Sequence, residues 1–324
     1  MRSIIILGAG NIGSRHLQGL SDLEFSSHIH VVDPDSKSLF LSQKRWDDLD
    51  CNRHVISYHS SIKEINKKEV SVAIIATPSS VRRDVFEDLI EHCDVESIIF
   101  EKFLFQVERD YHEVASSLRR NGINAWVNHP RRYFQIYKNI EDSIDNEPVN
   151  VSVSGTQWGL GCNAIHYADL FGWLTGSKEL IWDNSSLENR LLEAKRNNFV
   201  EFAGTLSAND TAGNILSLTC FEGQEPYKTV RISTPTQQWI INPLEQEGVH
   251  ITREKGEWVS KNIPAEIPYV SELTGEIVGE IIQNKTSDLP TYSKSKAYHL
   301  PLFRILRQHI GMIWGKEVEK CPIT

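Results

Sequence analysis

Three observations predict two domains of different class: a doubly wound α/β domain with a parallel sheet, then an α+β domain with a large, mainly antiparallel open sheet. Up to about residue 128, short β-branched runs alternate with longer amphipathic runs, which is the pattern of βαβ units. From about residue 149, alternating segments follow one another with turn residues between them. The tail then returns to helical periodicity. We therefore assign residues 1–128 to the first domain and 129–324 to the second.

The composition excludes several function classes. The chain has 324 residues, enough for two domains, and 34 Lys and Arg residues against 43 Asp and Glu residues give a formal net charge of -9. Because no stretch is dense in Lys or Arg, we expect neither a nucleic-acid partner nor a membrane partner. The longest apolar runs are strand-sized, and a glycine turn directly after the first strand argues against a cleaved signal peptide. Five cysteines without a CxxC pair indicate reduced thiols, no bound metal and a cytoplasmic location.

The first domain carries six strand candidates that are rich in Ile and Val, as expected for a sheet covered on both faces. Helical periodicity separates them at residues 12–20, 81–92 and 108–120, and Asn121-Gly122 is a helix stop. The strand candidates span residues 3–7, 28–33, 54–58, 70–77, 97–102 and 124–128.

The second domain begins with a one-sided strand at residues 149–158 and a helix at 162–174 that stops at Thr175-Gly176. The segments that follow are joined by Asn-Asp, Ala-Gly-Asn, Thr-Pro and Lys-Gly steps, which is hairpin chemistry. Helices at 271–285 and 294–310 end the chain, and the pattern allows them to pack back on the first domain. The alternating segments span residues 199–207, 214–221, 227–233, 238–241, 250–253 and 257–261.

A glycine-rich turn, GAGNIG at residues 8–13, joins the first strand to the first helix. Such a turn needs Gly8 for tightness, Gly10 for close approach of a pyrophosphate to the helix N-terminus, and Gly13 for helix–strand contact. Asp33 ends the second strand, where it would accept hydrogen bonds from ribose hydroxyls and repel a 2′-phosphate. We therefore expect NAD(H) rather than NADP(H), although the nearby Lys37 weakens the exclusion of a phosphate. A structural turn with a capping Asp is the alternative.

Ala76-Thr77-Pro78 ends the fourth strand candidate at the carboxyl edge of the sheet, where ligands bind in this architecture. Thr77 and Pro78 either line the cofactor or simply terminate the strand. The sequence leaves both interpretations open.

Four motifs follow one another along the chain: GAGNIGSRH at residues 8–16, ATPSSVR at 76–82, EKF at 101–103 and GLGCNAIHYADL at 159–170. In this order and spacing they resemble the glucose-fructose oxidoreductase, inositol dehydrogenase and MocA (Gfo/Idh/MocA) family over essentially the full chain. The resemblance implies a Rossmann domain followed by an α+β domain whose open sheet supports dimers or tetramers. It also implies a pyridine-nucleotide oxidoreductase that acts on sugars, cyclitols or sugar nucleotides.

The resemblance implies that Lys102 contacts the substrate hydroxyl beside the nicotinamide, because an EKP motif ends the fifth strand in this family. A partly desolvated Lys at this edge can help move a proton as hydride leaves the carbinol carbon. A solvated surface Lys is the alternative, which the apolar run at 98–100 disfavours. Phe103 stands where the family has Pro, so the backbone after Lys102 stays open. The expected cofactor contacts are Gly8, Gly10, Asn11, Ile12, Gly13, Asp33, Thr77, Pro78, Glu101 and Lys102.

His166 matches the His of the family's DxxxH motif and is the second expected catalytic residue. Cys162 stands where the Asp is expected, with Asn163 beside it, so neither helical neighbour on that side is a carboxylate. Asp169 either partners the imidazole or positions the helix. The chain is therefore either a dehydrogenase in which Asn163 contacts substrate or a protein that has lost catalysis. Retention of both Lys102 and His166 favours the first.

Further substrate contacts are expected from His129 and Arg132 after the sixth strand, and from Trp158, Cys162 and Asn163. An Arg at this place would suit a phosphate, pyrophosphate or carboxylate, since its planar fork binds such oxygens bidentately. A solvated helix N-terminus with surface salt bridges is the alternative. Arg82, where many relatives have His, is open in the same way.

From these features we expect an NAD-dependent dehydrogenase that oxidises a secondary hydroxyl, or reduces the ketone, of a sugar, cyclitol or sugar nucleotide. Lys102 and His166 would move the proton. A non-catalytic NAD-binding regulator or scaffold of the same fold is the alternative. We expect a homodimer or homotetramer assembled through the sheet of the second domain.

Overall fold

The computed structural model describes residues 1–66 and 69–324 and divides the chain into two compact units. Unit 1 comprises residues 1–105, 109–130 and 268–295. Unit 2 comprises residues 106–108, 131–267 and 296–324. Each unit is therefore assembled from segments that lie far apart in the sequence.

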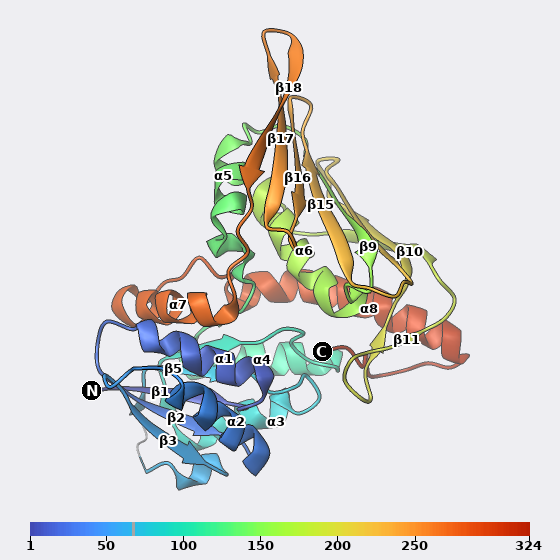
Figure 1. Ribbon diagram of the computed structural model, residues 1–324. Coiled ribbons are helices and arrows are strands. Elements are labelled where there is room, and N and C mark those ends of the chain that lie inside the picture. Colours follow the sequence, from blue (N-terminus) through green and yellow to red (C-terminus); the bar gives the residue numbers. More distant parts are fainter. Residues whose placement is uncertain (67–68) are drawn as a thin grey trace. The chain divides into compact units, whose positions relative to one another are not determined.

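Unit 1 is built on a six-stranded sheet in the order β3-β2-β1-β5-β7-β8. Figure 1 labels its strands β1, β2, β3 and β5. All neighbouring pairs are parallel. The central strands β5 and β7 are buried at every position, which explains their consecutive apolar residues. A short pair, β4 (Glu69–Val70) and β6 (Asp94–Val95), forms a separate two-stranded sheet. The six strands are β1 (Arg2–Leu7), β2 (Ser27–Val32), β3 (Val55–His59), β5 (Val72–Ile75), β7 (Ser97–Phe100) and β8 (Asn124–Val127).

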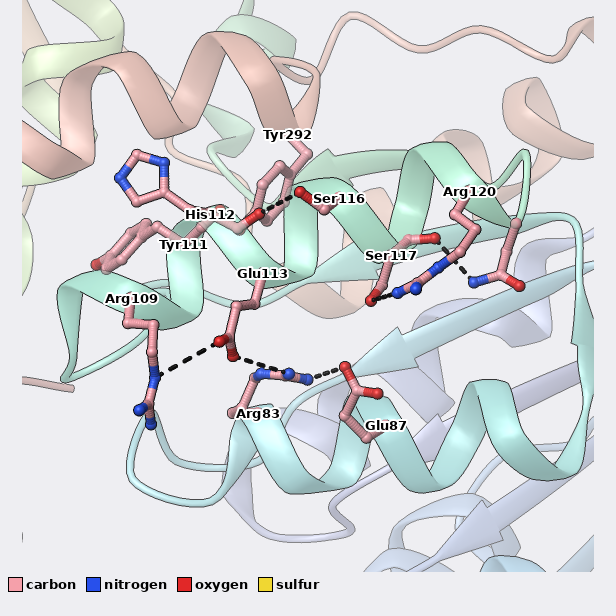
Figure 2. A network of polar contacts seen from close by, with 11 residues as sticks. Arg83, Glu87, Arg109, Tyr111, His112, Glu113, Ser116, Ser117, Arg120 and Tyr292 are labelled. Carbon is pink, nitrogen blue, oxygen red and sulfur yellow. Dashed lines mark hydrogen bonds and ion pairs between the residues drawn. The ribbon is translucent and has the colours of Figure 1, made fainter.

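Four helices connect these strands: α1 (Asn11–Gly19), α2 (Ser36–Asp47), α3 (Arg82–His92) and α4 (Glu108–Arg120). Figure 2 shows Arg83 of α3 between Glu87 of its own helix and Glu113 of α4, the latter at 3.2 Å. Exposed ion pairs of this kind contribute only about 0–1 kcal/mol each. The buried faces, which include Phe86 of α3 and Tyr111 of α4, therefore contribute most of the stability of these helices.

Helix α7 (Val270–Asn284) belongs to unit 1 and packs against α1 at two glycines. A Cβ on Gly19 would lie 2.8 Å from the Cβ of Thr274, and a Cβ on Gly275 would lie 2.6 Å from the carbonyl oxygen of Gly19. The two helices can approach this closely only because neither residue has a side chain.

Unit 2 is built on an eight-stranded sheet in the order β10-β13-β14-β9-β15-β16-β17-β18. Its neighbouring strands are antiparallel except β14 and β9, which run parallel. A two-stranded ribbon, β11 (Leu192–Glu193) and β12 (Val200–Glu201), lies apart from it. The eight strands are β9 (Asn150–Thr156), β10 (Ile181–Leu187), β13 (Gly204–Asn209), β14 (Ile215–Phe221), β15 (Tyr227–Ser233), β16 (Gln237–Asn242), β17 (Glu247–Glu254) and β18 (Glu257–Pro264).

Helix α6 (Leu160–Thr175) lies along one face of this sheet (Figure 1). Val151 and Val153 of β9 are fully buried on that face, and their partners in β15 are Ile232 and Val230. The remaining helices are α5 (Gln135–Ser143) and α8 (Tyr292–Trp314), of which residues 292–295 belong to unit 1. A Cβ on Gly172 of α6 would lie 2.2 Å from the hydroxyl of Tyr298, so α6 and α8 also meet at a glycine.

The predicted fold class is confirmed: a doubly wound parallel sheet and a mainly antiparallel sheet occur in that order. Two strand candidates are each divided in two, because their halves pair with different partners. The candidate at residues 70–77 covers the last residue of β4 and all of β5, and the candidate at residues 199–207 covers β12 and the first part of β13. Within residues 1–66 and 69–324, no helix combines the length and apolar character needed to cross a membrane.

Candidate active site

Three neighbouring strands of unit 1 end at one edge of the sheet with residues expected to bind cofactor and substrate. Gly8 follows β1, Thr77 lies shortly after β5, and Glu101 and Lys102 follow β7. Because these strands are adjacent in the sheet, their carboxyl ends lie within two inter-strand spacings, about 10 Å. This is the edge at which doubly wound sheets bind ligands.

The glycine turn fixes the start of α1. Gly8 has a φ of +96°, which L side chains rarely adopt, and its N–H donates to the carbonyl of Val32 at 2.8 Å. A Cβ on Gly13 would lie 1.7 Å from the carbonyl oxygen of Gly8, whereas a Cβ on Gly10 would meet nothing within 4 Å. Gly10 is the N-cap of α1, so this open space adjoins a helix N-terminus, where anionic groups are stabilised. Asn11 and Ile12 form the first turn of the helix.

Asp33 lies beside this turn, directly after β2. Its Oδ2 accepts the N–H of Ala9 at 2.7 Å, and its Oδ1 accepts the N–H of Asp35 at 2.8 Å. A carboxylate has about four acceptor sites, so both oxygens can accept further donors. The two interpretations of Asp33 are therefore compatible, since the residue caps the turn and still offers acceptors to ribose hydroxyls. Lys37 is exposed in the first turn of α2.

Arg45 of α2 is a cation at this turn that the sequence analysis missed. Its guanidinium donates to the hydroxyl of Ser14 at 2.5 Å and to the carbonyl of Asn11 at 3.2 Å. Burial and the charge of Arg15 lower the pKa of Arg45. In the sequence, Arg45 is only a basic residue near the end of a helix, which is common because it complements the helix dipole.

The loop after β5 contains a buried polar atom that suggests a ligand. The hydroxyl of Thr77 is buried and has no hydrogen-bond partner within the part of the chain that the structure describes, which is uncommon for buried polar groups. Pro78 is exposed beside it. Arg82 is 1% exposed and donates to the carbonyls of Thr77, Phe103 and Leu104. Arg82 thus ties the end of β5 to the loop that follows β7.

Glu101 is buried and accepts hydrogen bonds from two elements of unit 1. Its Oε1 lies 3.0 Å from Nε2 of His16 and accepts a hydrogen bond from the amide of Asn128. Nδ1 of His16 lies 2.9 Å from the hydroxyl of Thr274 on α7. Burial raises the pKa of Glu101, but the hydrogen bonds from His16 and Asn128, with the charges of His16 and Lys102, outweigh it and hold the pKa below its usual value.

These hydrogen bonds therefore hold the ionised Glu101 in place directly before Lys102. Lys102 itself is half-buried, and its peptide bond with Phe103 is cis. Glu101 is expected from its motif to contact the cofactor, and the structure places its carboxylate among His16, Asn128 and the N–H of Lys102, the last at 3.3 Å.

The residues at this edge fit a dinucleotide cofactor. The space at Gly10 adjoins the N-terminus of α1, Asp33 has acceptor capacity, and the hydroxyl of Thr77 lacks a partner. Across residues 1–66 and 69–324, no group of three or more His, Cys, Asp or Glu side chains is placed to hold a metal ion.

In unit 2, His166 lies on α6 and is 8% exposed. The helix begins after Gly159, which has a φ of +71°. Glu201 accepts the N–H groups of Gly161 at 2.6 Å and Cys162 at 3.1 Å. This carboxylate therefore caps the helix N-terminus, and the thiol of Cys162 bonds to the carbonyl of Gly159 at 3.5 Å.

Asn163 and Trp158 are both engaged within unit 2. The amide nitrogen of Asn163 donates to the carbonyls of Trp158 at 2.7 Å and Gly159 at 3.1 Å, which holds this side chain against the start of α6. Trp158 is 7% exposed, and its indole N–H donates to the carbonyl of Thr219 at 2.8 Å.

Two residues that follow β8 and were expected to contact substrate, His129 and Arg132, are buried. Arg132 donates to both carboxylate oxygens of Asp169, from Nε at 2.9 Å and from a terminal nitrogen at 2.6 Å. Asp169 thus accepts the pair of guanidinium donors that was expected to bind a substrate anion. His129, in unit 1, is fully buried and its Nε2 lies 3.0 Å from the hydroxyl of Ser295.

A pair of cations beside Tyr167, the residue that follows His166 in the sequence, was not predicted. Arg131 and Lys228 both lie against the ring of Tyr167 on α6, at 4.4 and 5.9 Å from its centre. Arg131 appears in the sequence beside Arg132, and no sequence pattern distinguishes their roles. Lys228 lies on a strand far from both in the sequence, so its proximity is a property of the fold.

The expected residues thus fall into two groups. Unit 1 brings together the glycine turn, Asp33, Thr77, Glu101 and Lys102, while unit 2 brings together Trp158, Cys162, Asn163 and His166. Three partners were not predicted from the sequence: His16 on α1, Thr274 on α7 and Asn128 directly after β8. His16 lies in the glycine motif, but its contact is 258 residues away in the sequence.

Comparison with known proteins agrees with this architecture. Residues 2–129 match the Gfo/Idh/MocA family model, described as an oxidoreductase family with an NAD-binding Rossmann fold. No curated protein matches the sequence. Among solved structures, UDP-N-acetylglucosamine 3-dehydrogenase GnnA from Acidithiobacillus ferrooxidans has a TM-score of 0.73 at 15% identity, covering 94% of this chain and 96% of that chain.

Two further solved structures carry bound cofactors. An oxidoreductase from Agrobacterium radiobacter in complex with NAD+, L-tartaric acid and magnesium has a TM-score of 0.68 at 15% identity, covering 97% of this chain and 95% of its own. A variant 3-ketoreductase from Actinomadura kijaniata in complex with TDP-benzene and NADP has a TM-score of 0.67 at 13% identity, covering 95% of this chain and 97% of its own. These likenesses are of fold, and the fold accommodates both cofactors.

Proposed function

We propose that this protein transfers a hydride between a nicotinamide dinucleotide and a secondary hydroxyl or ketone. The proposal follows from the match of residues 2–129 to the model of the Gfo/Idh/MocA oxidoreductase family with its NAD-binding Rossmann fold. The substrate class that we propose is a sugar, cyclitol or sugar nucleotide. Structural likeness to a UDP-N-acetylglucosamine 3-dehydrogenase and to a 3-ketoreductase supports this choice.

The observation that carries the proposal is the position of Lys102. It follows β7, one strand from Thr77 and two strands from the glycine turn. A dinucleotide held by Gly10, Asp33 and Thr77 would supply the hydride chemistry, which side chains cannot provide. What the chain must add is a group that takes or returns the hydroxyl proton, and a Lys at this edge can do so.

Lys102 and His166 share the proton chemistry in this proposal. In the oxidative direction, Lys102 accepts the proton of the substrate hydroxyl, and in the reductive direction it returns a proton to the new alkoxide. The Glu101 network positions Lys102, because the carboxylate bonds to the N–H of Lys102 at 3.3 Å. His166, on α6, is the second proton carrier in this proposal.

The test is turnover with a panel of sugars, cyclitols and sugar nucleotides in the presence of NAD+, followed by the absorbance of NADH. We expect Lys102→Ala to lower turnover by on the order of a hundredfold while NADH binding is preserved. Lys285→Ala is the matched control, since Lys285 pairs with Glu96 on the surface of the same unit. A Lys102→Ala variant that turns over at the wild-type rate would refute the assignment.

The alternative function is a non-catalytic NAD-binding regulator or scaffold. It is favoured by Cys162, which stands where the family has a carboxylate and whose N–H is capped by Glu201 at 3.1 Å. The same panel distinguishes the two functions. Persistent absence of NADH formation, despite measurable NAD+ binding, would support the regulator and contradict the enzyme.

We propose that NAD(H) is preferred over NADP(H). The support is Asp33, whose carboxylate faces the glycine turn and would repel a 2′-phosphate. Replacing it in Asp33→Ser removes a charged hydrogen-bond acceptor worth about 1.5–3 kcal/mol, so the preference should relax by roughly one to two powers of ten. Fluorescence titrations with NADH and NADPH measure this. A wild type that already binds NADPH more tightly would refute the preference.

We also propose a homodimer or homotetramer assembled through the eight-stranded sheet. Its strands expose Ile215, Phe221, Tyr227 and Trp258, which are each 46–57% exposed. Light scattering after size exclusion tests this, and a monomer at micromolar concentration would refute it. A cytoplasmic location is proposed from the five cysteines, none of which forms a disulfide: Cys51, Cys93, Cys162, Cys220 and Cys321. Cell fractionation tests it.

A further inference from the structure

Two cations of unit 2 converge on one buried phenol. The guanidinium carbon of Arg131 lies 4.4 Å from the ring centre of Tyr167, and the Nζ of Lys228 lies 5.9 Å from it. Tyr167 is 1% exposed, whereas both cations are half-buried. Burial raises the pKa of Tyr167, but the charges of Arg131 and Lys228 and hydrogen bonds from both outweigh it and lower the pKa. Both cations therefore lie against the same phenol ring.

Lys228 occupies a position on the inner face of the sheet. In β15 it pairs with Gly155 of β9, while Val230 pairs with Val153. Because side chains alternate along a strand, Lys228 shares the α6-facing side with Val230, which is fully buried. A Cβ on Gly155 would lie 2.6 Å from the Cα of Lys228. The backbone of β15 therefore reaches this position only because residue 155 is glycine.

Neither cation forms an ion pair with a carboxylate within unit 2. Among residues 1–66 and 69–324, none of the ion pairs includes Arg131 or Lys228. The neighbouring Arg132 shows the contrast, since it is paired through two hydrogen bonds with Asp169. Partly desolvated charges are normally paired, and two positive charges beside one phenol attract an anion.

We propose that Arg131 and Lys228 bind an anionic oxygen group of the substrate, a phosphate or a carboxylate. The guanidinium supplies a planar fork of donors and the ammonium supplies a compact charge, a combination that suits such oxygens. The inference rests on the proposed function for the existence of a substrate. It narrows the class from sugars and cyclitols in general to derivatives that carry a phosphate, a diphosphate or a carboxylate.

The role assigned from the sequence to Arg132 thus passes to the residue before it. Asp169 holds Arg132 in place, and the same turn presents Arg131 to Tyr167 on α6. Tyr167 directly follows His166 in the sequence, so an anion held by the two cations would lie next to the segment that carries the proposed proton carrier.

The experiment is calorimetric titration of the full chain with inorganic phosphate, diphosphate and acetate, each at constant ionic strength set with chloride. NADH is kept saturating, so that phosphate cannot bind at the N-terminus of α1. We expect wild type to bind at least one probe, and Arg131→Met and Lys228→Met each to weaken that binding by about tenfold or more. Lys261→Met is the matched control, because it removes one positive charge from the same sheet, where Lys261 pairs with Glu254.

The outcomes separate the possibilities. Binding of phosphate or diphosphate indicates a phosphorylated sugar or a sugar nucleotide, and binding of acetate alone indicates a sugar acid. Equal affinities in wild type and in both cation variants would overturn the proposal, as would failure of wild type to bind any probe. Tyr167→Phe, which keeps the ring, should retain the affinity within about threefold, because the phenol is not the ligand. Loss of binding in Tyr167→Phe together with retention in both cation variants would also overturn it.

Two controls keep the result interpretable. Thermal unfolding of each variant shows whether it is folded, and Lys228→Arg, which keeps the charge, should bind the probe if Lys228→Met does not fold. NADH titration of the same proteins tests the proposed function separately. If wild type binds no anion probe but still binds NADH and turns over, only the anion site is overturned. If wild type binds the anion probe but neither binds NADH nor turns over, the result counts against the proposed function alone.

Discussion

The buried pair of Arg132 and Asp169 allows a quantitative test of what stabilises unit 2. The two side chains are 8% and 1% exposed and share two hydrogen bonds at 2.9 and 2.6 Å. We expect Asp169→Leu to lower the free energy of unfolding by about 3–5 kcal/mol, because Arg132 would remain as a buried charge with two unpaired donors. For a unit of this size that corresponds to a fall in Tm of roughly 6–20 °C.

The double variant separates the cost of an unpaired charge from the value of the pair. Arg132→Met combined with Asp169→Leu removes both charges, and apolar replacement of a buried pair is often neutral or stabilising. We therefore expect the double variant to lie within about 2 kcal/mol of wild type, with a favourable coupling energy between the two sites. Urea unfolding followed by tryptophan fluorescence is suitable, since Trp173 lies 5.8 Å from the guanidinium of Arg132.

The matched control is the exposed pair of Lys261 and Glu254 at 2.6 Å. Glu254→Leu should change the free energy of unfolding by less than about 1 kcal/mol. The reasoning would be refuted if Asp169→Leu cost as little as this control, or if the double variant were as unstable as the sum of the two single variants.

Three further predictions concern unit 1. Gly10→Ala should fold normally but weaken NADH binding by about tenfold or more, whereas Gly13→Ala should unfold the unit, because only the Cβ at residue 13 would meet a backbone atom, at 1.7 Å. NADH titration measures the first effect and circular dichroism the second. Equal behaviour of the two variants would contradict the steric argument. Because the pKa of Glu101 is lowered from its ordinary value of 4.5, chiefly by His16 and Asn128 acting against burial, its stabilising contribution is present above that value and is lost as the pH falls through the lowered one. The difference in unfolding free energy between wild type and Glu101→Gln should therefore shrink on acidification, and a constant difference from about pH 6 to pH 3 would oppose this. Arg45→Met should raise the Kd for NADH severalfold, which is a loss of about 1 kcal/mol of binding free energy, and should reduce the dependence of that Kd on salt. An unchanged salt dependence would show that the charge of Arg45 does not act on the bound cofactor.

Much of the fold was predictable because its determinants are local. Helix α4 and strand β15 have the bounds that their periodicity predicts, residues 108–120 and 227–233. The glycine turn was readable for the same reason, since the requirement at Gly8 and Gly13 is steric and lies within one turn of chain. The two divided strands were not, because the division depends on which neighbour each half finds.

The candidate site was predictable only where a motif fixes a residue to the end of an element. Lys102 and Thr77 were placed correctly at the carboxyl ends of their strands for that reason. The choice between Arg131 and Arg132 was not available, because both residues have the same side chain and their roles depend on Asp169 and Tyr167, more than thirty positions later in the sequence. The position of Lys228 beside Tyr167 could not be predicted, since it depends on the register of β15 against β9, in which Lys228 pairs with Gly155.

The contact between α1 and α7 has a consequence for the order in which the protein can fold during its synthesis. Gly19 and His16 are made early, but their partners Gly275 and Thr274 lie in a segment that follows all of residues 131–267. At about 5–20 residues per second, translation leaves that face of α1 uncovered for on the order of ten seconds. Unit 1 of the nascent chain is thus finished late, and a fragment ending at residue 130 would lack the helix α7 that packs against α1.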